Sequence, residues 1–264
     1  SLQPLWEGLA SGLWDTASLR ALQVAYDIDL LHEYPPAIRQ QVTIMADSWA
    51  ALTDPKQLHL LRTGAFPVSP HAARLYPTGW RLLNQAGLWR FADETLLTTV
   101  DPGRHRIYPP APESFSRALR DAHVTLDPLS YMLIPWQQQL FSDAILSTAC
   151  AQTSVNLAVI ACALEQWRGT NGTYPERLDL LQPGTTKTLP SDPLSGQPLR
   201  YRRLSRDRFL LYSVGWNQTD DHGKTPQGRS AADLELRQGD WVWKYPAPSP
   251  RQACGWVARS SPPS

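Results

Sequence analysis

The chain has 264 residues and a formal net charge of +1, enough length for one large domain or two modest ones. Its near neutrality and the absence of a basic run exclude recognition of DNA or of an anionic membrane face by charge alone. No stretch reaches the roughly 18 consecutive apolar residues of a membrane span. The 24 prolines and 11 tryptophans predict short elements joined by turns around large aromatic side chains.

The first half of the chain has apolar residues at the three- and four-residue steps of amphipathic helices. Asp15 or Thr16 can cap the first helix, and Pro35-Pro36 is expected to end it. Glycines and prolines predict a loop before the third helix. The four helices are predicted over residues 16–34, 36–52, 79–100 and 114–126, with the loop over 60–79.

A long helix is predicted to begin at Asp143 and to organise the rest of the chain. Seven mostly apolar residues form a stripe along it: Leu146, Ala149, Thr153, Leu157, Ile160, Leu164 and Trp167. We expect the helix to end at Gly169, because glycine adopts the left-handed conformation at low cost. Asn171-Gly172 then forms a turn, and Pro175 prevents further helix.

Beyond this turn the pattern becomes strand-like. Two strands separated by a hairpin-length gap are predicted at 198–204 and 209–216, and a last strand at 240–245. We therefore predict an α+β fold, with a long helix packed on a small antiparallel sheet after a mostly helical N-terminal region. The predicted divisions are a helical region at 1–135, the helix and sheet at 136–250, and a tail at 251–264.

Four short motifs follow one another from the end of the long helix onward. They are Asn171-Gly172-Thr173-Tyr174-Pro175, Leu189-Pro190-Ser191-Asp192-Pro193, Gly196-Gln197-Pro198-Leu199-Arg200-Tyr201 and Leu211-Tyr212-Ser213-Val214-Gly215. In this order they resemble the C-terminal half of the major pseudopilin of type II secretion, over roughly residues 143–245. The whole chain also looks like a group of uncharacterised bacterial envelope proteins with a helical region before a pseudopilin-like end. Unlike pseudopilins, it has about 140 residues before the long helix.

The resemblance implies a calcium ion in the polar loop after the second strand. Calcium takes six to eight oxygen ligands, which loop carboxylates and backbone carbonyls supply in the pseudopilins. The corresponding residues are Asp220, Asp221 and Asp240, with carbonyls from Ser213 to Asn217 and a further acid from Asp233 or Glu235. The alternative is that Asp220-Asp221 ends a strand in water, without an ion.

Three tryptophans near this loop form a second candidate site. They are Trp216, Trp241 and Trp243, and the last two point to the same face of the final strand because they are two residues apart. That face either packs on the long helix or forms an exposed aromatic groove for a glycan or a peptide. The solvent exposure of the two rings distinguishes these possibilities.

A hydrolase is the less favoured alternative. His222 lies beside Asp221 and is the histidine nearest an acid cluster, but the chain has none of the common nucleophile, metallopeptidase or phosphate-loop motifs. We therefore predict a protein that acts by contact with a protein partner or by self-association rather than by catalysis.

The expected location is the periplasmic or extracellular face of the cell envelope. The sequence starts at Ser1 without methionine, so we expect the ectodomain of a membrane-anchored protein whose anchor is absent from this sequence. Cys150 and Cys162 are separated by roughly 18 Å on one helix and cannot pair with each other. Either could pair with Cys254 or remain a free thiol.

Overall fold

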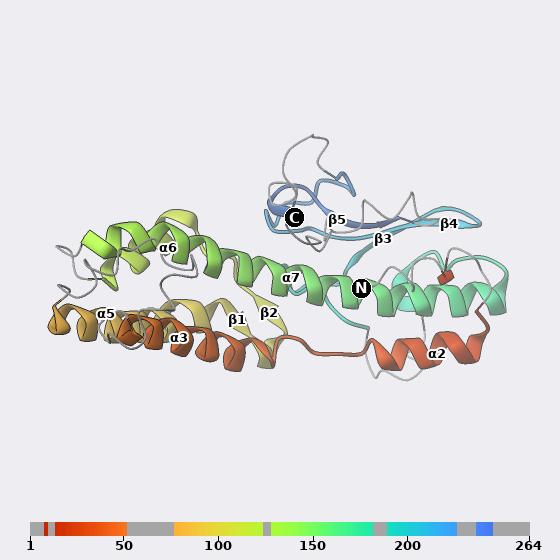
Figure 1. Ribbon diagram of the computed structural model, residues 1–264. Helices are drawn as coiled ribbons and strands as arrows, with labels where there is room; N and C mark the ends of the chain where they lie inside the picture. The colour runs from red at the N-terminus through yellow and green to blue at the C-terminus, as the bar shows by residue number, and fades with distance from the viewer. Residues whose placement is uncertain are drawn as a thin grey trace, which may run out of the picture. The chain divides into compact units, whose positions relative to one another are not determined.

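The computed structural model describes residues 8–9, 14–51, 77–123, 128–181, 189–225 and 236–244, with only the backbone described at 48–51, 128–133 and 135–136. The principal helices are α2 (Thr16–Ala25), α3 (Tyr34–Ala51), α5 (Thr78–Phe91), α6 (Pro112–Asp121) and α7 (Pro128–Asn171) (Figure 1). The strands are β1 (Val100–Asp101), β2 (Arg106–Ile107), β3 (Arg200–Ser205), β4 (Arg208–Ser213) and β5 (Trp241–Lys244). Short π- and 3₁₀-helical segments occur at Ala92–Leu96, Leu97–Thr99, Pro102–Arg104 and Leu178–Leu180. The predicted α+β fold is confirmed.

The chain folds into two compact units that are not continuous in sequence. The sheet unit contains Ser1–Leu30, Gly103–Ile107 and Leu146–Ser264, and the helical unit contains Leu31–Pro102 and Tyr108–Ile145. A division into consecutive ranges, such as 1–135 and 136–250, does not describe this arrangement, because the first helix belongs with the sheet. The tail at 251–264 lies outside the described residues.

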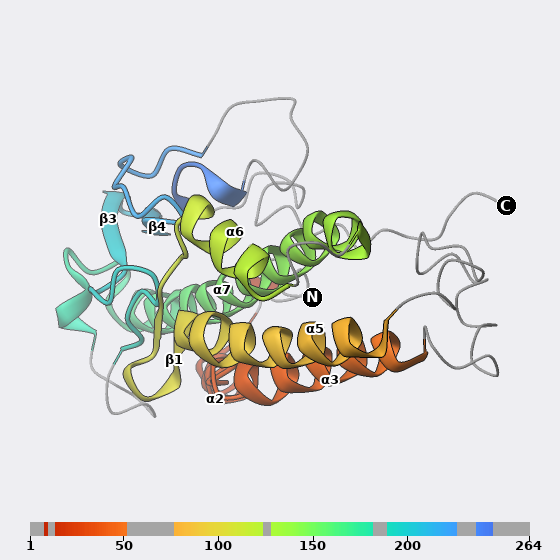
Figure 2. The same ribbon diagram turned by 90° about the vertical axis from the view of Figure 1, so that its left-hand side faces the viewer.

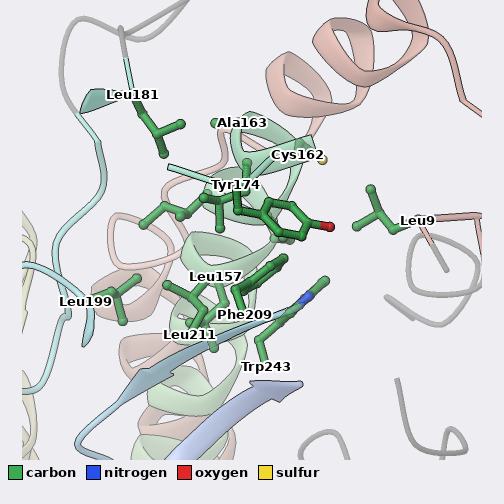
Figure 3. Close-up of a cluster of buried hydrophobic side chains, with 14 of the residues drawn as sticks. Leu9, Leu157, Cys162, Ala163, Tyr174, Leu181, Leu199, Phe209, Leu211 and Trp243 are labelled. Carbon is green, nitrogen blue, oxygen red and sulfur yellow. The ribbon is translucent and has the colours of Figure 1, made fainter. Parts of the chain in front are cut away.

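The core of the sheet unit lies between α7 and an antiparallel sheet of order β3-β4-β5. Leu157 and Leu164 from the helix pack with Phe209 and Leu211 from β4, and Trp243 of β5 completes this face (Figure 3). Helix α2 adds Leu19 to the same cluster. The cluster forms because residues two apart on each strand point to one face of the sheet.

Tyr174 is buried in this cluster together with its hydroxyl group. The ring is fully buried and packs edge-on against Phe209, with 4.8 Å between the ring centroids. Its hydroxyl donates a hydrogen bond to Glu165, whose other carboxylate oxygen forms an ion pair with Arg168 at 2.9 Å. A buried carboxylate is stabilised only when its oxygens are paired in this way.

The long helix begins earlier and ends later than predicted. It starts at Pro128, where the missing proline N–H costs no hydrogen bond, and it ends at Asn171. The left-handed residue is Gly172, with φ of 72°, and its N–H donates to Arg168 O at 2.8 Å. The predicted end at Gly169 was wrong because the sequence offers two glycines and only this backbone geometry distinguishes them.

The turn after α7 is fixed by the β3–β4 hairpin. Arg206 Nε donates to Gly172 O at 3.2 Å, and Arg203 Nη1 donates to Tyr174 O at 3.1 Å. The Tyr201 hydroxyl donates to Pro175 O at 2.7 Å. These side chains satisfy carbonyls that no helix or strand pairs.

Pro35-Pro36 begins a helix instead of ending one, so this prediction was wrong. Helix α2 ends at Ala25, and both prolines lie in the first turn of α3, where no backbone donor is required. The segment between the helices is held by Gln152 of α7, whose amide oxygen accepts from Leu30 N at 2.7 Å and whose amide nitrogen donates to Ile28 O at 3.2 Å. A tertiary contact of this kind is not visible in local sequence.

The helical unit packs around aromatic side chains. Phe91 of α5 contacts Phe115 of α6 and Phe141 of α7, with centroid separations of 5.4 and 5.8 Å. Tyr34 is buried at the start of α3, and its hydroxyl donates to Leu96 O at 3.3 Å. Figure 2 shows α3 and α5 side by side.

Replacing Phe209 by alanine is expected to lower the free energy of unfolding by about 3–5 kcal/mol, because it leaves a cavity between α7 and the sheet. The control is Leu204→Ala on the same hairpin, where 49% of the side chain is exposed. This control should change stability by less than about 0.5 kcal/mol. Urea denaturation of both variants measures the difference, and equal effects would contradict the described core.

Stability is expected to fall at alkaline pH as Tyr34 ionises. Burial raises its pKa to about 12, against a hydrogen bond with Thr99 that acts to lower it. The pKa of Tyr34 in the folded state exceeds the usual value of about 10. The protonated hydroxyl therefore contributes fully to the free energy of unfolding below pH ~10, and this contribution is lost as the pH rises towards 12. Thermal melting across this range should show a smaller pH dependence for Tyr34→Phe than for the unchanged chain. An identical dependence would contradict the burial of this hydroxyl.

Candidate functional site

The first part of the predicted acidic loop, residues 216–225, folds back over the face of the sheet that points away from α7. The Tyr212 hydroxyl donates to Asp220 Oδ1 at 3.0 Å, and Gly223 lies against the side chain of Leu210. Both β4 residues belong to this outer face, because Leu211 between them points into the core. The loop therefore buries apolar surface that a three-stranded sheet would otherwise expose.

Asp240 joins the two ends of this loop. Its side chain is 1% exposed, and its carboxylate oxygens accept from Asp221 N at 3.3 Å and from Gly223 N at 2.6 Å. Burial raises the pKa of Asp240, the two N–H groups act to lower it, and the neighbouring Asp220 and Asp221 raise it. The carboxylate thus satisfies two backbone donors of the loop.

Asp220 is held by three different donors. His222 N donates to it at 2.9 Å in addition to the Tyr212 hydroxyl, and Arg200 Nε lies 3.5 Å away. Burial acts to raise the pKa of Asp220, but these hydrogen bonds and nearby positive charges hold it below the usual range. Asp221 accepts from Asn217 Nδ2 at 3.1 Å.

Gly215 marks the point where the chain leaves β4. It has φ of 69°, and a Cβ added there would lie 2.3 Å from Gly239 O. Its N–H donates to the Oγ of the fully buried Ser213 at 3.2 Å. Only glycine permits this close approach between the start and the end of the loop.

Calcium binding by the acids of this loop, which the resemblance implies, stays a prediction. Asp220, Asp221 and Asp240 lie in one loop, but N–H and O–H donors occupy their carboxylates and Arg200 adds a positive charge. Within the described ranges no three acidic, histidine or cysteine side chains converge as a metal site. Asp233 and Glu235, offered as a further acid, lie outside the described residues.

Two of the three tryptophans near the loop, Trp241 and Trp243, are parts of the core. Trp241 and Trp243 are 4% and 2% exposed, and the Trp241 indole N–H donates to Leu236 O at 3.0 Å. Neither ring offers a free face to a sugar. Trp216 is half-buried, with the Arg237 guanidinium 5.7 Å from its ring centroid. The packing alternative accounts for the positions of Trp241 and Trp243.

The Asp221–His222 pair lies in an exposed turn. His222 is 80% exposed and has φ of 60°, and its Nδ1 lies 3.6 Å from Asp220 Oδ1. A general base normally lies in a pocket that excludes water and holds a substrate. The exposed position of His222 neither excludes water nor encloses a substrate.

One structural acid was missed in the sequence. Asp192 is 1% exposed, and its carboxylate oxygens accept from Leu194 N at 3.0 Å and from Val214 N at 3.2 Å. It therefore joins the Leu189–Pro193 motif to the end of β4. Aspartate before proline is a known turn signal, but the second bond spans 22 residues and has no local signature.

A cleft of about 430 Å³ near the end of α7 was also missed. Its lining includes Trp14, Asp15, Glu165, Arg168 and Asp207. Asp15 caps α2 by accepting from Ser18 N at 2.8 Å, and Glu165 is paired with Arg168 and Tyr174. The i,i+3 spacing of Glu165 and Arg168 was the available signal. These polar groups already serve the fold.

Comparisons with protein-family models, with curated proteins and with solved structures found no match to this chain. Within the described residues, Gln137–Asn171 is long and apolar enough to cross a membrane, and 67% of the apolar window is buried in the protein. A buried core helix meets the same criterion.

Replacing Asp192 by alanine is expected to cost about 2–4 kcal/mol of unfolding free energy, because it leaves two buried N–H groups without an acceptor. Asp192→Asn retains one acceptor oxygen and should cost less. The control is Asp207→Ala, an exposed acid of the same unit, which should be nearly neutral. Chemical denaturation measures all three, and a neutral Asp192→Ala would remove this carboxylate from the account of the fold.

Proposed function

We propose that this protein is a non-enzymatic component of the bacterial cell envelope that acts by protein–protein contact on a pseudopilin-like helix and sheet. The proposed location is the periplasmic or extracellular side of the envelope. The proposed partner is another envelope protein or a second copy of the chain.

The main support for this proposal is that the motifs shared with pseudopilins lie together against α7. Tyr174 lies in the core beside Phe209, and Asp192 binds the end of β4 at Val214. Asn156 of α7 donates to Ser191 O at 2.8 Å, which attaches the same motif to the long helix. Residues that recur together in the resemblance thus act together as one scaffold.

The use of polar groups in the candidate sites also favours a structural role. The carboxylates of Asp192 and Asp240 accept backbone N–H groups, and the Glu165 carboxylate pairs with Arg168. A catalytic group must instead be free to contact a substrate. Functional residues of a contact protein lie on its surface, where Leu83 is 60% and Leu180 is 41% exposed.

A photo-crosslinking amino acid at Leu83 or Leu180 tests this function in cells that produce the full-length protein. We expect light-dependent adducts to a defined envelope protein or to a second copy, identified by mass spectrometry. External protease should also digest the protein in intact spheroplasts. The same variants kept in the dark are the control. Absence of adducts at both positions, or protection from external protease, would overturn the proposal.

A further inference from the structure

Two exposed arginines of the β3–β4 hairpin, Arg202 and Arg208, are not paired with an acid among the described residues, although Asp207 precedes Arg208 in the chain. Arg202 and Arg208 are both exposed, and neither forms an ion pair or hydrogen bond with a described residue. Arg202 lies opposite Leu210 and Arg208 opposite Ser205, so the two guanidinium groups extend from adjacent strands on the outer face. Like charges on neighbouring strands repel, and an anionic ligand would relieve this repulsion.

Strand β3 also forms one edge of the sheet. It pairs with β4 on one side only, and no described residue hydrogen-bonds its backbone on the other side. Alternate N–H and C=O groups of such an edge are available to an added strand. Leu204, the extra residue at a register shift, is 49% exposed beside these arginines. We call β3 together with Arg202 and Arg208 the arginine edge.

The charge of the arginine edge indicates what can occupy it. Arg200 and Arg203 of β3 are paired with Asp220 and Glu176, whereas Arg202 has no acidic partner among the described residues. Pairing two copies of β3 would bring these arginine-rich strands together without adding an acid for Arg202. An extended segment with glutamate or aspartate at alternate positions would instead meet guanidinium groups and backbone donors together. An anionic membrane would interact with the arginines but not with the backbone donors of the strand. Leu204 alone provides little apolar surface for insertion into a membrane.

We propose that the arginine edge binds an extended acidic segment of a partner protein, which adds to β3 as a fourth strand. This inference rests on the proposed contact function and names the chemistry of the partner. The added strand supplies backbone hydrogen bonds for affinity and carboxylates for selectivity.

Fluorescence anisotropy with the whole chain tests the inference, with a labelled peptide of alternating glutamate and valine of about ten residues as the probe. We expect saturable binding that Arg202→Glu/Arg208→Glu weakens at least about tenfold. The control variant Arg117→Glu/Arg120→Glu makes the same charge change at exposed positions of α6 and should bind like the unchanged chain. Unchanged melting temperatures establish that both variants fold.

Two further probes distinguish strand addition from attraction by charge. A peptide of alternating glutamate and proline has the same charge but lacks half of the backbone donors, so it should bind at least about tenfold more weakly. Vesicles of phosphatidylglycerol and phosphatidylcholine should not compete with the acidic peptide. Equal binding of both peptides, competition by the vesicles, or no effect of the Arg202→Glu/Arg208→Glu change would overturn the inference. If the inference failed in this way but crosslinked adducts still formed at Leu83 in cells, the proposed contact function would remain supported.

Discussion

The sheet unit depends on the hydrogen bond between Tyr174 and Glu165. The tyrosine is needed as a large ring at the centre of the core, but its hydroxyl cannot be buried without an acceptor. Glu165 supplies the acceptor from α7, and Arg168 compensates its charge while lying over the Tyr174 ring at 5.4 Å. Each of the three side chains makes the burial of the other two tolerable, so they act as a unit.

Other segments are attached to α7 by side-chain hydrogen bonds at partly buried positions. Gln152 and Asn156 are polar residues of α7, and each binds backbone groups of a segment far away in sequence. Arg106 binds Ser195 O at 2.9 Å and Leu194 O at 3.1 Å, which fixes the same loop from another part of the chain. Irregular segments are ordered here by side chains that replace the missing backbone partners.

The pattern of apolar residues in the sequence predicted the types and the order of the main helices and strands. The helical spacing of apolar residues in α7 and the short strand-like runs at β3, β4 and β5 were sufficient to predict the α+β fold, because run length and turn residues distinguish strands from helices. Helix ends were predicted less well. Pro35-Pro36 and Gly169 are compatible with more than one backbone position, and tertiary contacts select among them.

The candidate site was predicted only as a group of residues in one loop. Asp220, Asp221 and Asp240 do lie together, but the sequence could not reveal which groups occupy their carboxylates. Three of the donors to Asp220 and Asp240 are backbone N–H groups, which every residue type except proline carries. The same reason hid Asp192, whose partner at Val214 is a backbone group distant in sequence.

The close approach of Gly215 and Gly239 has an evolutionary consequence. The two ends of the intervening segment are fixed by the sheet and by the contacts of Asp240, whatever lies between them. Lengthening such a segment adds little entropic cost, since the cost of closing a loop grows only slowly with its length. Related chains can therefore gain residues here at little cost as long as the contacts of Asp220 and Gly223 with the sheet are kept.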